Sequence, residues 1–243
     1  MTTLVKISIA IFIALFLSSC AFDVNFGDFG TGKKGNGVVV EERRDITDNF
    51  TNVSASEGIK VYVTQASDFA IAVEADENVI DLIGTDIKNG TLRIHAIENI
   101  GRATKKVFVS LPNITGLESS SGAHLTAQNT IKSNELSIAS SSGSILNAAL
   151  HVTELELDAS SGANMEVSGK AKEVYVDGSS GANISAKNLM AEQCSAEASS
   201  GSNVSVNVSE ALTADASSGG NISYAGDATV KKNKSVSGSV HKY

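Results

Sequence analysis

Acidic side chains recur at a nearly constant spacing in the second half of the chain. Asp158, Asp177, Glu197 and Asp215 follow one another at intervals of 19, 20 and 18 residues, and each stands four residues before a glycine. If these repeats stack as adjacent strands, the carboxylates lie about 4.8 Å apart. Like charges that close raise one another's pKa values or recruit cations. The column could therefore be a stripe that binds Ca²⁺ weakly or a basic partner, or a solvated face that resists aggregation.

A second polar column follows the same glycines by two residues. It consists of Asn164, Asn183, Asn203 and Asn221. Stacked asparagine amides can form a hydrogen-bonded ladder, and asparagine also tolerates turn geometry, so a structural role explains this column. Contact with carbohydrate is the alternative. Tyr175 is the one aromatic residue that the repeats place on an outward position, which gives little support for sugar stacking.

Catalytic chemistry finds no support in the sequence. The histidines lack metal-ligand spacing, and the motifs of serine hydrolases, zinc proteases and calcium-binding nonapeptide repeats are absent. The acids form a repeating column, whereas an enzyme site would interrupt the repeat. We expect no enzyme activity, no metal centre and no cofactor.

The elements that must position these columns are set by a repeated Ser-Gly unit. Its glycines are spaced by 21, 19, 19, 20, 18 and 19 residues, and they are Gly122, Gly143, Gly162, Gly181, Gly201, Gly219 and Gly238. A fixed period of this length in a strand-like sequence is typical of a solenoid whose units bury one another's apolar edges. We expect each glycine to adopt a backbone conformation that a Cβ would strain, or to allow close approach of neighbouring coils.

Apolar residues form four columns when the repeats are aligned on their glycines. They lie seven and five residues before the glycine and three and five residues after it, as Leu155, Leu157, Met165 and Val167 do around Gly162. All four offsets are odd, so strand alternation places these residues on one side, which we expect to be the core. The residues immediately before and after each glycine also have odd offsets. They are serine before it and mostly alanine, serine or glycine after it, so we expect the core to narrow at this edge.

The N-terminus resembles the signal of a bacterial lipoprotein. Residues 1–19 hold one lysine and an apolar run from Ile7 to Leu17 that is short for a membrane span. Leu17-Ser18-Ser19 precedes Cys20 as in a lipobox, which implies that Cys20 is acylated, with palmitate as the added chain, and becomes the first mature residue. An ordinary cysteine near a conventional cleavage site is the alternative. More than one acyl chain gives stable anchoring in a membrane.

The rest of the chain divides by composition. Residues 20–37 contain five glycines and no periodicity, so we expect a flexible tether. Residues 38–113 contain short alternating runs, with a hairpin-type turn at Asn89-Gly90 and a short helical segment between Glu77 and Ile83, and could close the first edge of the solenoid. Residues 114–243 form the solenoid itself. Cys194 lies on an apolar position of the repeat, so we expect a buried thiol and no disulfide.

The repeats from about Val38 to Tyr243, with the Ser-Gly-x-x-apolar pattern and the end Asn221 to Asp227, resemble the putative auto-transporter adhesin, head GIN domain family. The resemblance implies an all-β fold, a right-handed parallel β-helix with coils of about 19 residues. It also implies a secreted or lipid-anchored protein of the Gram-negative envelope. It brings no catalytic residues to transfer.

These features predict a non-catalytic lipoprotein of the cell envelope, anchored in the outer membrane, that acts as an adhesin or scaffold. The alternative is a β-helix that binds or cleaves glycans. The partner is expected to be a protein or a glycan. Without the signal the chain holds 18 basic and 27 acidic residues, a net charge of −9, which argues against nucleic-acid binding.

Overall fold

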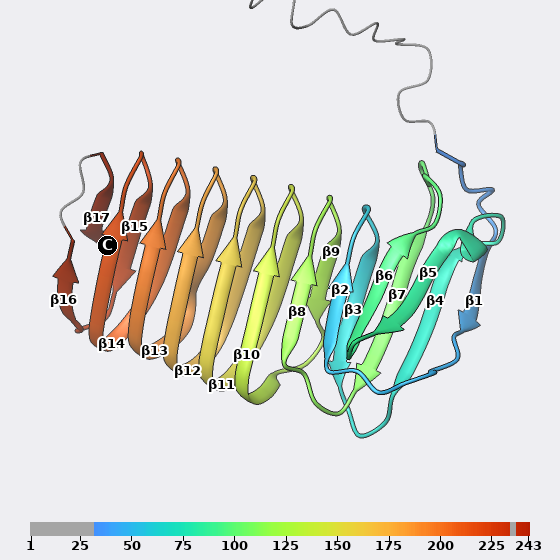
Figure 1. Ribbon diagram of the computed structural model, residues 1–243, viewed down its shortest axis with the longest axis horizontal. Coiled ribbons are helices and arrows are strands. Elements are labelled where there is room, and N and C mark those ends of the chain that lie inside the picture. The colour runs from blue at the N-terminus through green and yellow to red at the C-terminus, as the bar shows by residue number, and fades with distance from the viewer. Residues whose placement is uncertain (1–31, 234–236) are drawn as a thin grey trace, which may run out of the picture. The chain divides into compact units, whose positions relative to one another are not determined.

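The protein is a β-solenoid, as the repeat predicted. The structure is a computed structural model that describes residues 32–233 and 237–243, and this part of the chain contains strands and a single short 3₁₀ helix. The solenoid has about seven turns, with coils about 19 residues apart (Figure 1). Its N-terminal elements are β1 (Val39–Arg43), β2 (Asn52–Ala55), β3 (Lys60–Gln65), β4 (Ala70–Asp76), η1 (Ile80–Leu82), β5 (Ile83–Lys88), β6 (Thr91–Ala96) and β7 (Lys105–Leu111). The remaining strands are β8 (Gly116–Ser119), β9 (His124–Ala127), β10 (Ile131–Ser140), β11 (Ile145–Ala159), β12 (Asn164–Gly178), β13 (Asn183–Ala198), β14 (Asn203–Ala216), β15 (Asn221–Ala225), β16 (Thr229–Lys232) and β17 (Ser239–Lys242).

Each coil runs along two faces joined by two different corners. In the coil around Gly162, the end of β11 reaches a tight turn at 160–163, and β12 returns along the opposite face. The second corner is a bend within the long strand itself, near Lys170. Successive coils pair in parallel with like positions opposite one another, as in Leu157 beside Val176. Columns seen in the sequence therefore become straight rows along the solenoid axis.

The tight corner is made by two consecutive residues with positive φ. In one turn Ser161 has φ 51° and Gly162 has φ 71°, and the Ala163 amide donates to the Ser160 carbonyl at 3.1 Å. The same pair of conformations recurs at Ser121-Gly122, Ser142-Gly143, Ser180-Gly181, Ser200-Gly201 and Ser218-Gly219. Gly238 differs, because it has no positive φ. A Cβ there would lie 2.2 Å from the Ala216 backbone, so close approach of two coils requires glycine at this position.

We expect Gly162→Val to destabilise the protein far more than Asn164→Ala in the same turn. At φ 71° the branched side chain of valine clashes with the backbone, which destabilises the folded state by about 2 kcal/mol. The exposed Asn164 side chain contributes about 0.5 kcal/mol. Urea unfolding of the two variants measures the difference, and equal unfolding midpoints would contradict this account of the turn.

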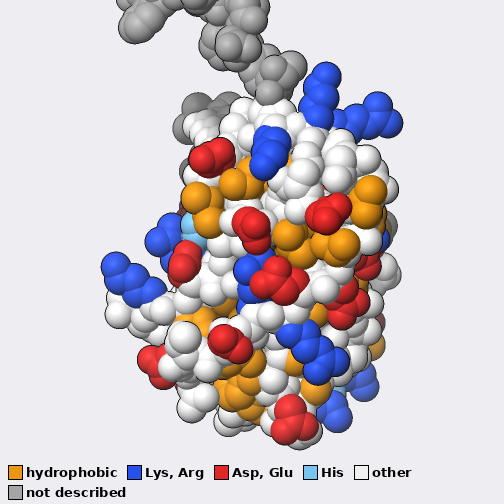
Figure 2. All heavy atoms as spheres, turned by 90° about the vertical axis from the view of Figure 1, so that its right-hand side faces the viewer, with side chains coloured by type: hydrophobic (Ala, Val, Ile, Leu, Met, Phe, Trp, Pro, Cys, Tyr) orange, Lys and Arg blue, Asp and Glu red, His pale blue; other side chains and the backbone are white. Residues whose placement is uncertain are grey.

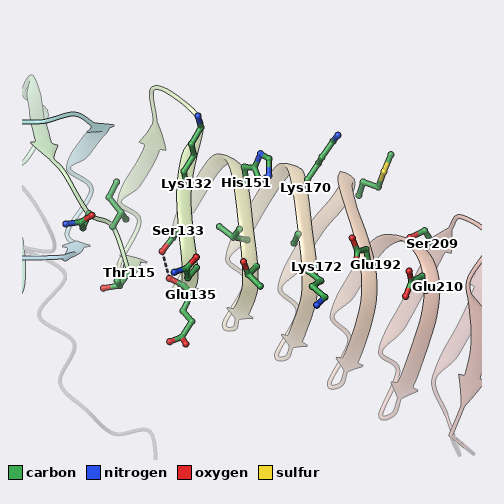
Figure 3. A pocket seen from close by; sticks show the side chains of 17 residues that line it. Thr115, Lys132, Ser133, Glu135, His151, Lys170, Lys172, Glu192, Ser209 and Glu210 are labelled. Carbon is green, nitrogen blue, oxygen red and sulfur yellow. Dashed lines mark hydrogen bonds between the residues drawn. The ribbon is translucent and has the colours of Figure 1, made fainter.

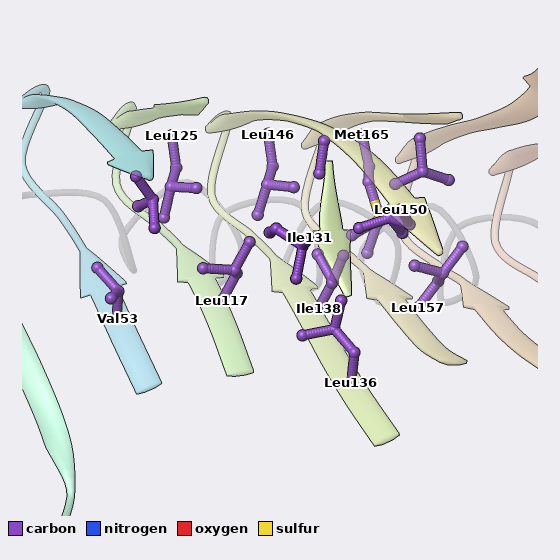
Figure 4. Packing of buried hydrophobic residues seen from close by; sticks show 14 of the residues in the cluster. Val53, Leu117, Leu125, Ile131, Leu136, Ile138, Leu146, Leu150, Leu157 and Met165 are labelled. Carbon is purple, nitrogen blue, oxygen red and sulfur yellow. The ribbon is translucent and has the colours of Figure 1, made fainter. Parts of the chain in front are cut away.

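The four apolar columns form the core, as predicted. Leu155, Leu157, Met165 and Val167 are all at most 2% exposed, and Figure 4 shows such side chains from successive coils packed along the axis. The prediction that the core narrows beside each glycine holds for the residue after the glycine and was wrong for the serine before it. The left-handed turn directs that serine outward, and all of these serines are exposed. The narrow positions are three residues before the glycine and one after it, for example Ala159 and Ala163.

Several narrow positions hold buried serines that bond across coils. The Ser144 hydroxyl donates to the Ser119 carbonyl at 2.7 Å, and the Ser202 hydroxyl donates to the Gly178 carbonyl at 2.7 Å. A buried hydroxyl without such a partner would cost free energy, so these bonds make serine acceptable inside the stack. The narrow space excludes larger side chains, and a nearby carbonyl can accept from a hydroxyl, so these positions hold alanine, serine or glycine.

Residues 38–113 do more than cover the first coil. Strands β2 and β3 pair in parallel with β8 and β9 and so continue the solenoid, and β6 and β7 add a further parallel layer outside them. Antiparallel β4, β1 and β5 then close the stack. The turn at Asn89-Gly90 joins β5 to β6 with two positive φ angles, as expected of a hairpin. Figure 2 views this end, where acidic, basic and apolar side chains are interspersed.

The segment 32–37 is fixed to this end, which corrects part of the expected tether. The Gly35 amide donates to the Arg102 carbonyl at 3.0 Å, and the Gly37 amide donates to Asp76 Oδ1 at 2.5 Å. Asp76 is 3% exposed, and its other oxygen accepts from the Thr104 amide at 2.6 Å. One buried carboxylate thus ties the incoming chain to the start of β7. Residues 20–31 of the expected tether, and the signal at 1–19, lie outside the described residues.

Candidate functional site: the acidic face and the edge groove

The acidic column forms a continuous row, as its spacing suggested. Asp158 lies beside Asp177, Asp177 beside Glu197, and Glu197 beside Asp215 on adjacent parallel strands. The first three are exposed and Asp215 is half-buried. The Asp215 carboxylate accepts from the Asn233 amide at 3.3 Å. Among the described residues, no group of three or more His, Cys, Asp or Glu side chains is placed to hold a metal ion.

Further acids widen this row into an acidic face. The outward positions of the strands before each tight turn include Glu118, Glu135, Glu154, Glu156 and Glu173 besides the column itself. The pKa of Asp158 is raised above its usual 3.8 by partial burial first, and then by the charges of Asp177 and Glu156. The face therefore carries mutual repulsion in the folded state.

Removing one of these charges is expected to stabilise the protein at neutral pH. Because the pKa of Asp158 is raised in the folded state, its ionised carboxylate destabilises the fold. This destabilisation is fully present above the folded-state pKa and is lost as the pH falls below it. Asp158→Asn should raise stability at pH 7 by about 0.5 kcal/mol, because solvent screens a partly exposed group, and the gain should shrink toward pH 4. Thermal melts at pH 7 and pH 4 test this. Glu166→Gln, on the opposite face with Asn147 and Ser185 beside it in register, is the control and should change the stability at pH 7 much less.

The asparagine column forms the amide ladder that was expected. The Asn183 amide nitrogen donates to Asn164 Oδ1 at 3.2 Å, and that of Asn203 donates to Asn183 Oδ1 at 3.1 Å. Asn221 lies beside Asn203 in register. Each ladder bond uses one N–H of one amide and the oxygen of the next. The remaining donor and acceptor positions of these side chains face solvent.

The two cysteines have separate outcomes. Cys20 lies outside the described residues, so its acylation remains a prediction from the sequence. Cys194 is 6% exposed, and burial raises its pKa to about 12. A thiol of this kind stays protonated at neutral pH and acts as a small apolar side chain.

A groove lies along the bend corner, and the sequence prediction missed it. It has a volume of about 1300 Å³ and runs across β10 to β14 (Figure 3). Its floor contains the nearly buried Val152 and Ala171. The groove was missed because the bend lies inside continuous strands, where no glycine recurs in every coil to mark a corner.

Charged side chains of both signs line this groove. Lys132, His151 and Lys170 occupy equivalent positions on three successive strands and point to the same side in Figure 3. Glu192 and Glu210 lie toward the C-terminal end of the groove. The sequence carries a signal for the basic residues, since each stands eleven residues before a repeat glycine.

Aromatic side chains lie on both faces. Tyr175 is 47% exposed on the acidic face, as its repeat position suggested. On the opposite face Tyr62 and Phe108 lie on neighbouring strands, with ring centroids 5.1 Å apart and planes 18° from parallel. The two rings stack on one another, so each covers much of the other's face and leaves less of it for a ligand.

Nothing helical in the described part of the chain has the length and apolarity needed to cross a bilayer. This finding applies to residues 32–233 and 237–243.

Comparison with known proteins places this architecture among bacterial adhesin-like folds. The model of the family described as "putative auto-transporter adhesin, head GIN domain" matches residues 49–228. A structure described as a putative adhesin from Bacteroides fragilis superposes with a TM-score of 0.80 and 18% identity, covering 87% of this chain and 100% of its own. No curated protein matches the sequence.

Two further solved structures share the fold. A putative adhesin from Parabacteroides merdae has a TM-score of 0.72 at 21% identity, covering 86% of this chain and 98% of its own. A putative lipid binding protein from Parabacteroides distasonis has a TM-score of 0.68 at 18% identity, with coverages of 86% and 98%. At these identities the likeness concerns the fold, and the residues of the groove must be interpreted from this chain alone.

Proposed function

Because the chain belongs to the putative auto-transporter adhesin, head GIN domain family, we propose that it is a non-catalytic, lipid-anchored adhesin of the outer membrane. The observation that carries the proposal is the row-by-row register of its outward side chains, which presents repeated groups over many coils. Repetition of this kind suits the recognition of an extended ligand, as in other solenoids with long binding surfaces. A catalytic site would instead bring different groups together at one point.

The binding role is tested with the purified full-length protein in a neutral detergent. The protein is applied to an array of glycans and extracellular-matrix proteins, once with Ca²⁺ and once with a chelator. Specific binding that saturates would support the adhesin role, and loss of binding in chelator would support cation binding by the acidic face. Absence of binding in both conditions would count against an adhesin and favour a scaffold inside the envelope.

The anchor is tested independently of any ligand. Cells expressing the protein are supplied with an alkyne-tagged palmitate analogue, and the protein is isolated from the membrane fraction. We expect the wild-type chain to carry the tag and Cys20→Ser to lack it and to leave the membrane fraction. Equal tagging of the two chains would show that Cys20 is not the lipid attachment site. Cys194→Ser serves as the control, because its buried thiol should not affect the tag.

A glycan is favoured over a protein as the ligand by one observation, the groove across β10 to β14. It is open, elongated along the solenoid axis, and lined by both apolar and polar groups. A linear saccharide chain can lie along such a groove and meet equivalent side chains on each coil. The glycan-cleaving alternative gains nothing comparable from the described residues.

A further inference from the structure

The basic residues of the groove form a row that nothing in the described chain neutralises. Lys132 pairs in register with His151, and His151 pairs with Lys170. None of the ion pairs found among the described residues includes them, and the Lys132 contacts are made by its backbone. Lys132 and Lys170 are two strands apart, so their positive charges stand about 10 Å from each other with His151 between them. We will call Lys132, His151 and Lys170 the cationic row.

The spacing of the cationic row matches a ligand with regularly repeated negative groups. Parallel strands are about 4.8 Å apart, so the row extends over about 10 Å along the solenoid axis. Lysine stems can lie along the apolar floor beside Ala171 while the ammonium groups reach a ligand above it. Lys172 also lines the groove, but it points to the opposite side from the row in Figure 3.

The surroundings of the row limit how wide that ligand can be. Glu135, Glu154 and Glu173 lie beside one another on the same three strands, a few residues beyond the bend. They form an acidic border parallel to the cationic row. A nucleic-acid duplex or an anionic membrane would bring its charge against this border as well as against the lysines, and would be repelled. A single thin chain can meet the row alone.

On these grounds we propose that the groove binds an acidic polysaccharide, a linear glycan with carboxylate groups along its length, through Lys132, His151 and Lys170. This inference rests on the proposed adhesin function and specifies its ligand class. The saccharide rings lie over the floor formed by Val152 and Ala171. The carboxylates lie toward the cationic row, and Glu192 and Glu210 disfavour continued acidic binding at the C-terminal end of the groove.

The experiment measures binding of fluorescent polygalacturonate to the full-length protein in neutral detergent, by anisotropy, with neutral dextran of the same length as comparison. We expect polygalacturonate to bind, dextran to bind at least about tenfold more weakly, and added salt to weaken the acidic ligand selectively. Lys132→Gln with Lys170→Gln should weaken binding about tenfold, whereas arginine at both positions should preserve it.

Lys60→Gln with Lys88→Gln is the matched control. Both lysines are exposed and outside the groove, and the change in net charge is the same. If the control weakens binding as much as the groove variant, or if polygalacturonate and dextran bind equally, the inference is overturned. If polygalacturonate fails to bind while the array of glycans and proteins gives a specific partner, the ligand class is wrong and the adhesin role stands. If the array is also blank, the adhesin role itself is contradicted.

Discussion

Gly169→Ala is expected to lower the free energy of unfolding by about 3 kcal/mol or more. Gly169 lies in β12 near the bend corner, with φ 113°, a region that residues with a side chain rarely adopt. A Cβ at this position would lie 2.0 Å from the Leu150 carbonyl oxygen on the neighbouring strand. Neither the backbone angle nor the carbonyl can adjust without breaking the pairing between β11 and β12.

Gly143→Ala separates the two causes of this effect. Gly143 also has a positive φ, 68°, but a Cβ there meets nothing within 4 Å. We expect Gly143→Ala to lower the free energy of unfolding by about 1 kcal/mol, the strain of the backbone angle alone. Urea denaturation followed by circular dichroism gives both values. Equal losses in the two variants would show that close approach at Gly169 does not matter.

Leu157→Ala should cost about 2 to 5 kcal/mol, the usual range for truncation of a fully buried leucine. Leu157 is 0% exposed and lies between Ile138 and Val176 on the adjacent coils. Each coil is stabilised mainly by its two neighbours, so the cavity weakens two coil interfaces together. We also expect the unfolding transition to broaden, because the halves of the solenoid on either side lose part of their coupling.

Glu156→Ala is the control for this variant, because Glu156 is the exposed neighbour of Leu157 on the same strand. Its stability should stay within about 0.5 kcal/mol of wild type. A small increase is expected, since Glu156 contributes to the raised pKa of Asp158. A loss comparable to that of Leu157→Ala would mean that the face, and not the core, dominates stability here.

The repeat could be predicted from the sequence because each coil obeys the same steric rules. Period-2 alternation identified the buried columns, and the glycine spacing identified the tight corner. The orientation of the serine before the glycine could not be derived from alternation, because two successive left-handed residues reverse the pattern locally. Ser161 and its equivalents are exposed for this reason.

The N-terminal arrangement depended on long-range pairing that the sequence does not encode as a pattern. Strands β6 and β7 follow β2 and β3 in the chain, yet they lie on the far side of them from β8 and β9. Nothing in the short alternating runs distinguishes this order from a simple succession of coils. Likewise, Asp76 resembles an ordinary polar strand end, and its three backbone neighbours come from distant segments.

The clamp at Asp76 has a mechanical consequence. A pull on the chain before Gly35 first reaches the bonds that join Gly35 and Gly37 to the capped end of the stack. A ligand held at β10 to β14 would transmit the opposing force through the coils between. Because the hydrogen bonds that join neighbouring coils run along the solenoid axis, such a force stretches all bonds of one interface together. The protein would thus resist detachment by sharing the load across many weak bonds.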